Sequence, residues 1–334
     1  MQKLKLPIVI AVLITCHNRR AITLATLAAL FNQKNQAQIA LDVYLVDDRS
    51  TDGTADAVRE HYSQVKILQG TGNLFWNGGM RLAFAEAVQR NYDYYLWLND
   101  DTILYPNALE TLLATSNHLT TADYNQAIVS GSTCDPQTQK LFSGGFRYRW
   151  HKLFMRFDLV EPKEQVQRCD TISGNCVLIP RSVVQILGNL NPNFTHFLGD
   201  IDYGLRAQQQ GCTVWITPGY LGTSPQHHQR GNEAYELGSL SEVFQKLRHP
   251  KGLSFGNDLQ QRLLPVNEWT AFLQEHAGVF WLIPWLLTYR KLVGLILALF
   301  CQTGKSLTAS QLWLSLRVSI QAIANLFFNK NSKF

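Results

Sequence analysis

The chain has 334 residues, of which 46% are hydrophobic and 16% are charged. This length and composition exclude a disordered or fibrous protein and fit one large globular domain, or one domain with an appendage. The net charge of +5 arises after residue 270, where basic residues outnumber acidic ones six to one. The first 270 residues are therefore neutral overall, and we expect no nucleic-acid-binding surface on them.

The six cysteines show no C-x-x-C pair and no zinc-like spacing. Several lie in apolar runs, where a small hydrophobic residue would serve equally well, so we expect a reducing compartment. The apolar run near the N-terminus leads into polar residues, Thr15 to Arg20, and not into a small-residue cleavage site. It therefore predicts a first β-strand and not a signal peptide.

The first hundred residues alternate between apolar runs of strand length and helical patterns, which predicts a parallel, Rossmann-like sheet. The runs predict strands at residues 6–14, 43–46, 65–68 and 94–98, with helices at about 21–31 and 81–90. Beyond a helix near Pro106 the alternation is less regular, so we expect mixed or antiparallel sheet there. This part includes strands near 127–130 and 213–217, a strand pair at 169–172 and 176–180, and a helix that starts near Asp200.

The strand at 94–98 ends in Asn99, Asp100, Asp101 and Thr102. Because adjacent strand residues point to opposite faces, we expect Asp100 and Asp101 to meet different partners, one a Mg²⁺ or Mn²⁺ ion and the other a sugar or a basic side chain. The alternative is a polar turn that caps the helix near Pro106.

Acidic residues follow two other element boundaries, at Asp47-Asp48 and at Asp200 and Asp202. The helix dipole alone favours the second pair in a first helical turn. The sequence contains neither a P-loop nor a complete G-x-G-x-x-G motif, so phosphate would be held by a metal on Asp100 or Asp101. One imidazole of His227-His228 would complete the metal ligands, although a His pair in a polar segment is also typical of a solvated loop.

The composition changes near residue 236, which divides the chain into a domain of residues 1–235 and a helical region of residues 236–334. The apolar stretches there fall short of the ~20 residues that a spanning helix needs. An amphipathic pattern from Leu312 to Phe327, with Trp and basic residues, favours a helix in the interface of an anionic leaflet. The alternatives are a helical cap on the main domain or a contact in a homodimer.

Four of these segments, in this order, resemble motifs of the family 2 glycosyltransferases with the GT-A fold, and among them the rhamnosyltransferase-like members. They are Thr15-Cys16-His17-Asn18-Arg19, Val46 to Thr54, Asn99-Asp100-Asp101 and Gly199-Asp200-Ile201-Asp202. Two positions depart from the family pattern: Asn99 stands first in the D-x-D metal motif, and Gly199 stands where Glu is usual before the base.

The resemblance implies an α/β fold, a GT-A Rossmann-like mixed sheet flanked by helices with a helical C-terminal appendage. It implies an inverting transfer from a nucleotide-diphosphate sugar, such as dTDP-rhamnose or a UDP-sugar, to a glycan or lipid-linked acceptor at the inner face of the plasma membrane. Mn²⁺ or Mg²⁺ would bind Asp101 with His227 or His228, and the catalytic acids would be Asp200, as base, and Asp202. The donor-binding residues would be Thr15, His17, Asn18, Arg19, Asp47, Asp48, Trp76, Asn77, Gly78, Gly79 and Asp100.

Two other classes of function remain open from the residues. A sugar nucleotidyltransferase shares this kind of sheet and metal, but it would need a glycine-rich loop after the first strand, and Thr15 to Arg20 contains no glycine. A non-catalytic nucleotide-sugar-binding protein at the membrane surface is the other, and it would bind the donor without turnover.

Overall fold

The computed structural model describes residues 7–34, 38–151, 154–196, 198–225, 268 and 271–277. Strands and helices alternate in its first part, as the apolar periodicity predicts. This part consists of β1 (Ile8–Cys16), α1 (Arg20–Phe31), β2 (Ile39–Asp47), α2 (Thr54–His61), β3 (Lys66–Gln69), α3 (Phe75–Ala87) and β4 (Tyr94–Leu98).

Short strands dominate the second part of the chain. It consists of β5 (Ile103–Leu104), α4 (Ala108–Thr121), β6 (Ala127–Cys134), β7 (Leu141–Ser143), β8 (Gly145–His151), β9 (Phe154–Leu159), β10 (Gln167–Cys169), β11 (Thr171–Ile172), β12 (Cys176–Pro180), α5 (Arg181–Leu187), α6 (Gly199–Gln209) and β13 (Thr213–Thr223).

The main sheet has the strand order β10-β13-β6-β12-β4-β1-β2-β3. The half formed by β4, β1, β2 and β3 is parallel, whereas β12 lies antiparallel between β4 and β6. In the parallel half Cys16 lies opposite Asp47, and Asp47 lies opposite Gln69. The polar segments that follow these strands therefore meet at one edge of the sheet, where open α/β sheets bind ligands.

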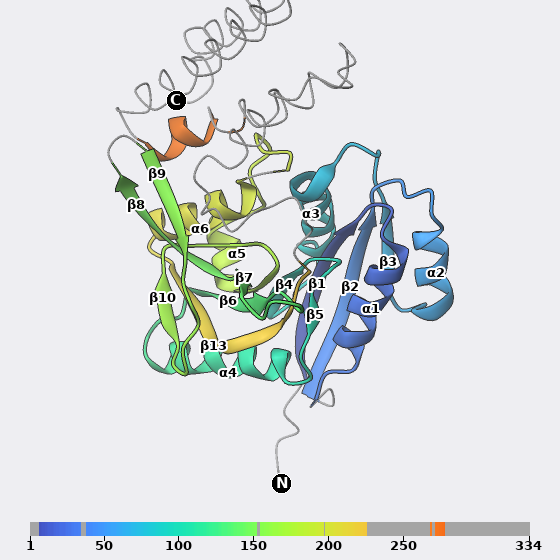
Figure 1. Cartoon of the computed structure of the whole chain (residues 1–334), viewed down its shortest axis with the longest axis horizontal. Coiled ribbons are helices and arrows are strands. Elements are labelled where there is room, and N and C mark those ends of the chain that lie inside the picture. The colour runs from blue at the N-terminus through green and yellow to red at the C-terminus, as the bar shows by residue number, and fades with distance from the viewer. Residues whose placement is uncertain are drawn as a thin grey trace, which may run out of the picture.

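Helices cover both faces of the sheet (Figure 1). Alternate residues of β1 face opposite sides because side chains alternate along a strand. Ala11 and Leu13 pack with residues of α3, α5 and α6, whereas Ile10 and Val12 pack with residues of α1, α2 and α4. Both layers consist of buried hydrophobic residues, and they hold the strand ends in place for a site.

Two expectations about the second half of the chain are resolved by the structure. The mixed sheet is confirmed by the antiparallel position of β12. The strand pair expected at 169–172 and 176–180 is wrong, since β10 pairs with β13, β11 with β8, and β12 with β4 and β6. We expected strands that are neighbours in the sequence to pair. Instead β12 is buried between β4 and β6, which lie far from it in the sequence, and it pairs with both.

Most of the C-terminal region lies outside the described residues, as does the amphipathic segment from Leu312 to Phe327. Glu268 and residues 271–277 are described, and the short helix of the latter lies beside β8 and β9 in Figure 1, where it is orange. Within the described part of the chain, no helix combines the length and the apolar character that crossing a membrane requires.

Candidate active site

The turn that follows β4 brings two carboxylates to one point. Arg19 Nη1 lies 3.1 Å from Asp100 Oδ1 and 2.7 Å from Asp101 Oδ2. The expectation that the two acids face different partners is therefore wrong. β4 ends at Leu98, and the Thr102 amide donates to the Asn99 carbonyl at 3.2 Å, so the two acids lie in a turn where strand alternation no longer applies.

Burial makes this acidic pair unusual. Asp100 and Asp101 are 6% and 8% exposed. Burial raises the pKa of Asp100 to about 7, with the charge of Asp101 adding to the rise and Arg19 opposing it. Asp100 Oδ2 is buried and has no hydrogen-bond partner among the described residues. Two adjacent carboxylates with an uncompensated buried oxygen fit the ligand set that Mg²⁺ or Mn²⁺ takes.

The segment after β1 is joined to the segment after β2. The Asn18 amide donates to Ser50 Oγ at 2.9 Å, and Asn18 Oδ1 accepts from the Thr51 amide at 2.7 Å. His17 Nδ1 lies 2.7 Å from the Asp48 carbonyl oxygen. His17 and Asn18 are exposed and Arg19 is partly exposed, so this joined edge presents polar side chains to solvent beside the acidic turn.

The acids after β2 are held by the main chain. Both oxygens of Asp48 accept backbone hydrogen bonds, Oδ1 from Gly72 at 2.6 Å and Oδ2 from Leu74 at 2.8 Å and Phe75 at 3.2 Å. Asp47 Oδ1 accepts from the Ser50 amide at 3.2 Å. The two carboxylates are nearly fully buried. Each shapes the loop around it, and Asp48 fixes the entry into α3.

The first turn of α3 carries the predicted Trp76-to-Gly79 segment. Trp76 Nε1 donates to Asn99 Oδ1 at 2.7 Å, which ties α3 to the acidic turn. Gly79 lies so close to β1 that an added Cβ would meet Thr15 Oγ1 at 2.1 Å. Gly78, which precedes Gly79 in the helix, is partly exposed. A bulkier residue at 79 would push the helix away from the strand end, so glycine sets their separation.

Asn77 lies deeper than the other residues of this segment, with no exposed surface. Its Nδ2 donates to the carbonyls of Asn191 at 3.0 Å and Phe194 at 2.6 Å. The Asn77 amide also donates to the Thr195 carbonyl at 3.0 Å. The side chain therefore holds residues 188–196, which we call the α5–α6 loop, and this loop leads into the helix that bears Asp200.

The acids expected at a helix start lie in the first turn of α6. Asp200 is partly exposed, and its Oδ2 accepts from the Gly174 amide at 2.8 Å. The neighbouring Asn175 carbonyl accepts from the Asn99 amide at 2.9 Å. A short path through residues 174 and 175 therefore connects Asp200 to the acidic turn, and the sequence analysis did not single out these two residues.

Asp202 differs from Asp200 in its surroundings. It is 0% exposed, and its two oxygens lie 2.8 Å from Arg206 Nε and 2.8 Å from His276 Nε2. Burial opposes its ionisation, but the hydrogen bond from His276 and the charge of Arg206 outweigh burial and hold the pKa of Asp202 below its usual range. His276 was not predicted as part of any site.

His227 and His228 lie outside the described residues. The segment that leads to them is described up to residue 225 and lies beside the acidic turn. Ser224 Oγ lies 2.9 Å from Thr102 Oγ1, and both side chains are fully buried. The pairing of β13 with β5 fixes this position. Nothing in the composition of either segment indicated that contact.

Parallel strands deliver buried acids and polar loops to one edge of the sheet, which is the arrangement of a GT-A fold. Residues 11–185, slightly more than half of the chain, match the model of the family described as Glycosyl transferase family 2. The chain belongs to this family. It is a glycosyltransferase that uses a nucleotide-sugar donor, and the predicted GT-A fold is confirmed.

The chain is also similar to individual proteins. It is 23% identical over 211 residues to an N-acetylglucosaminyl-diphospho-decaprenol L-rhamnosyltransferase of Mycobacterium tuberculosis, in strain CDC 1551 / Oshkosh and in strain H37Rv, and the match covers 57% of this chain and 67% of that protein. A solved structure of mannosyltransferase PcManGT from Pyrobaculum calidifontis, in complex with GDP-Man and Mn²⁺, aligns with 98% of this chain and 82% of its own at 13% identity and a TM-score of 0.48.

Proposed function

We propose that this glycosyltransferase moves a sugar with inversion of configuration, with the donor diphosphate at the Asp100-Asp101 turn and with Asp200 as base. The observation that carries the proposal is the contact path from Asp200 through Gly174 and Asn175 to that turn. It sets a partly exposed carboxylate beside the place where a diphosphate would be bound. This spatial relation suits a direct displacement between an acceptor and a donor.

A divalent ion fits the acidic turn. Asp101 and Asp100 would hold Mn²⁺ or Mg²⁺, since both carboxylates converge and Asp100 Oδ2 is buried without a partner among the described residues. When bound, such an ion would offset negative charge on the departing diphosphate. Arg19 lies against both acids, and its guanidinium is placed to bind phosphate oxygens at the same edge.

His227 or His228 would complete this set of ligands. Ser224 is fixed beside Thr102, next to Asp101, and three extended residues span at most ~10 Å. The imidazole of His227 is therefore within reach of the acidic turn. Separate His227→Ala and His228→Ala variants would identify the ligand, because only the ligand's loss should weaken Mn²⁺ binding measured by calorimetry.

In the displacement, the acceptor hydroxyl oxygen forms a bond to the anomeric carbon while the bond from that carbon to the diphosphate oxygen breaks. Asp200 takes the hydroxyl proton, and the nucleoside diphosphate leaves. The polar edge formed by Thr15, His17, Asn18 and the loops held by Asp47 and Asp48 would bind the nucleoside, with Trp76, Gly78 and Gly79 closing the donor site.

The finer identity of the substrates follows the similar proteins. We propose a rhamnosyl donor, dTDP-rhamnose before a UDP-sugar, because the matched relative is an L-rhamnosyltransferase. That relative's name also supports a lipid-linked acceptor, which would place the enzyme at the inner face of the plasma membrane and bring the basic, apolar C-terminal region into contact with the bilayer surface.

The test of the proposed base is Asp200→Asn, an amide of the same shape that cannot accept the proton. We expect kcat for transfer to fall by about 10²–10⁴-fold, with the donor Kd within twofold of wild type. Asp56→Asn, on the exposed face of α2, is the matched control. If Asp200→Asn retains near-normal kcat, Asp200 is not the base. A donor screen with dTDP-rhamnose and UDP-sugars decides the sugar, and binding without turnover would favour a non-catalytic protein.

A further inference from the structure

The segment that contains Glu268 and residues 271–277 is packed into the catalytic domain. Phe272 is fully buried, and its ring centroid lies 6.0 Å from that of Phe157 in β9 and 6.4 Å from that of Phe194 in the α5–α6 loop. We call these residues the docked segment. They follow the end of β13 by more than 40 residues, so these contacts join parts of the chain that are far apart in the sequence.

Glu268 binds the main chain of the α5–α6 loop. It is 2% exposed, and its Oε1 accepts from the amides of Thr195 at 2.7 Å and His196 at 3.1 Å. The Thr195 carbonyl accepts in turn from the amides of Asn77 at 3.0 Å and Gly78 at 3.4 Å. The loop is therefore held between the donor-side helix α3 and a buried carboxylate of the docked segment.

His276 binds the helix that follows this loop. Its Nε2 lies 2.8 Å from Asp202 Oδ1, while Arg206 Nε donates to Asp202 Oδ2 at 2.8 Å. The other His276 nitrogen, Nδ1, lies 3.2 Å from Gln209 Nε2. Asp202 thus joins α6 to the docked segment. It lies two residues after Asp200, in the same first turn of the helix.

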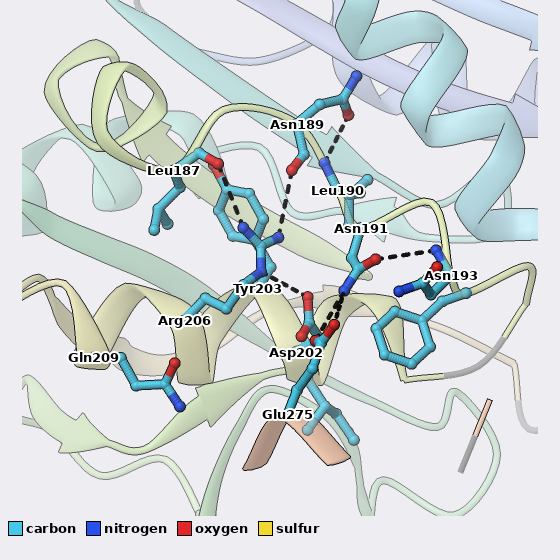
Figure 2. Close-up of polar contacts among 12 residues, drawn as sticks. Leu187, Asn189, Leu190, Asn191, Asn193, Asp202, Tyr203, Arg206, Gln209 and Glu275 are labelled. Atoms are coloured by element: carbon cyan, nitrogen blue, oxygen red, sulfur yellow. Dashed lines mark hydrogen bonds and ion pairs between the residues drawn. The ribbon is translucent and has the colours of Figure 1, made fainter. Parts of the chain in front are cut away.

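A second contact holds the start of the loop. Asn191 Nδ2 donates to both carboxylate oxygens of Glu275, at 3.0 and 2.9 Å. Figure 2 shows Asp202 between Arg206 and Glu275, with Asn191 beside them. Arg206 also donates to the carbonyls of Leu187 and Asn189, both at 3.3 Å. The loop and the first turn of α6 are consequently fixed at both ends by charged groups.

We propose that Glu268 and His276 are positioning residues for sugar transfer: they hold the α5–α6 loop and the first turn of α6 so that Asp200 meets the acceptor hydroxyl. This inference rests on the proposed function, in which Asp200 is the base. A reacting group displaced by about 1 Å can lose about 10²-fold in rate, so these contacts act on kcat. The proposed donor site is built from β1, β2, α3 and the acidic turn. We therefore expect substitutions at Glu268 and His276 to leave the affinity for the donor unchanged.

Matched pairs of substitutions separate positioning from stability. Glu268→Gln keeps an acceptor oxygen at the same reach, whereas Glu268→Asp withdraws it. His276→Gln keeps a donor near the Nε2 position, whereas His276→Asn is too short. We expect Glu268→Asp and His276→Asn to lower kcat at least tenfold with the donor Kd within twofold of wild type, and each Gln variant to recover most of the kcat of wild type.

Val58→Ala is the stability control, since Val58 is fully buried in α2, in the core on the other face of the sheet. The melting temperature of Val58→Ala measures its loss of stability, and its kcat shows how much activity such a loss removes. The proposal is overturned if Glu268→Asp and His276→Asn keep the kcat of the control, or if the paired Gln variants lose as much as they do. Asp200→Asn is measured alongside, so that the two failures can be told apart. If Asp200→Asn stays active, the base assignment fails and the positioning of Asp200 fails with it; if Asp200→Asn is inactive while Glu268→Asp and His276→Asn keep the kcat of the control, only the positioning role fails.

Discussion

The contact between Gly199 and Asn77 gives a stability prediction that can be worked from distances. A Cβ added at Gly199 would lie 2.0 Å from Asn77 Oδ1 and 2.7 Å from its Cγ. Asn77 cannot swing aside without losing the bonds from its Nδ2 to the carbonyls of Asn191 and Phe194. Gly199→Ala should therefore overpack a fully buried contact at the start of α6.

Overpacking of this kind costs about 1–3 kcal/mol. The alanine side chain returns about 0.4–1 kcal/mol by restricting the unfolded chain, because Gly199 does not have a positive φ. We expect Gly199→Ala to lower the free energy of unfolding by about 1–2 kcal/mol. Asn77→Ala should cost about 1–3 kcal/mol by itself, since it leaves the carbonyls of Asn191 and Phe194 without their donor.

A double-mutant cycle measured by urea unfolding tests the contact. In Asn77→Ala/Gly199→Ala the clash has no partner atom, so the double variant should be more stable than the sum of the single losses predicts by the cost of overpacking, about 1–3 kcal/mol. Additivity within about 0.5 kcal/mol would refute the reasoning, because the two residues would then not be in contact. The same close approach accounts for the departure from the family pattern at position 199, because any side chain there would meet Asn77.

Three further outcomes are expected. Asp101→Asn should weaken Mn²⁺-dependent donor binding at least tenfold in calorimetry, while Asp56→Asn leaves it unchanged; equal affinities would remove the metal assignment. Asp202→Asn should lower the free energy of unfolding by about 3 kcal/mol at pH 7. Because the pKa of Asp202 is lowered in the fold, this difference should persist above about pH 4 and vanish as the pH falls below the folded value, whereas a difference that grows on acidification would be the wrong sign. Deleting residues 278–334, which keeps the docked segment, should abolish co-sedimentation with anionic liposomes; retained binding would locate the membrane contact elsewhere.

Part of the candidate site was predictable because it depends on short-range patterns. An apolar run that ends in acids indicates a strand end, and parallel strands bring such ends to one edge, so the segments at Asp47 and at Asp100 could be placed together. The helix start at Asp200 followed from its acids and from the periodicity after them.

The directions of individual side chains were not predictable in this way. Alternation failed at Asp100 and Asp101, because the strand ended one residue before the motif and a turn rotated both carboxylates toward Arg19. Asp48 and Asn77 belong to the predicted motifs, yet their side chains bind main-chain groups of other loops. A motif gives the residue type and its place on an element, whereas the partner depends on which loops pack there.

The sequence by itself determined the β/α alternation, the edge of the sheet where the candidate site lies and the acids that lie there, since these depend on local periodicity and on element ends. Only the tertiary structure decided that β12 lies between β4 and β6, that Gly199 lies against Asn77, and that Glu268 and His276 reach the loop and helix around Asp200. Contacts between residues far apart in the sequence leave no periodic signal, because they arise from burial and charge pairing after the elements have packed.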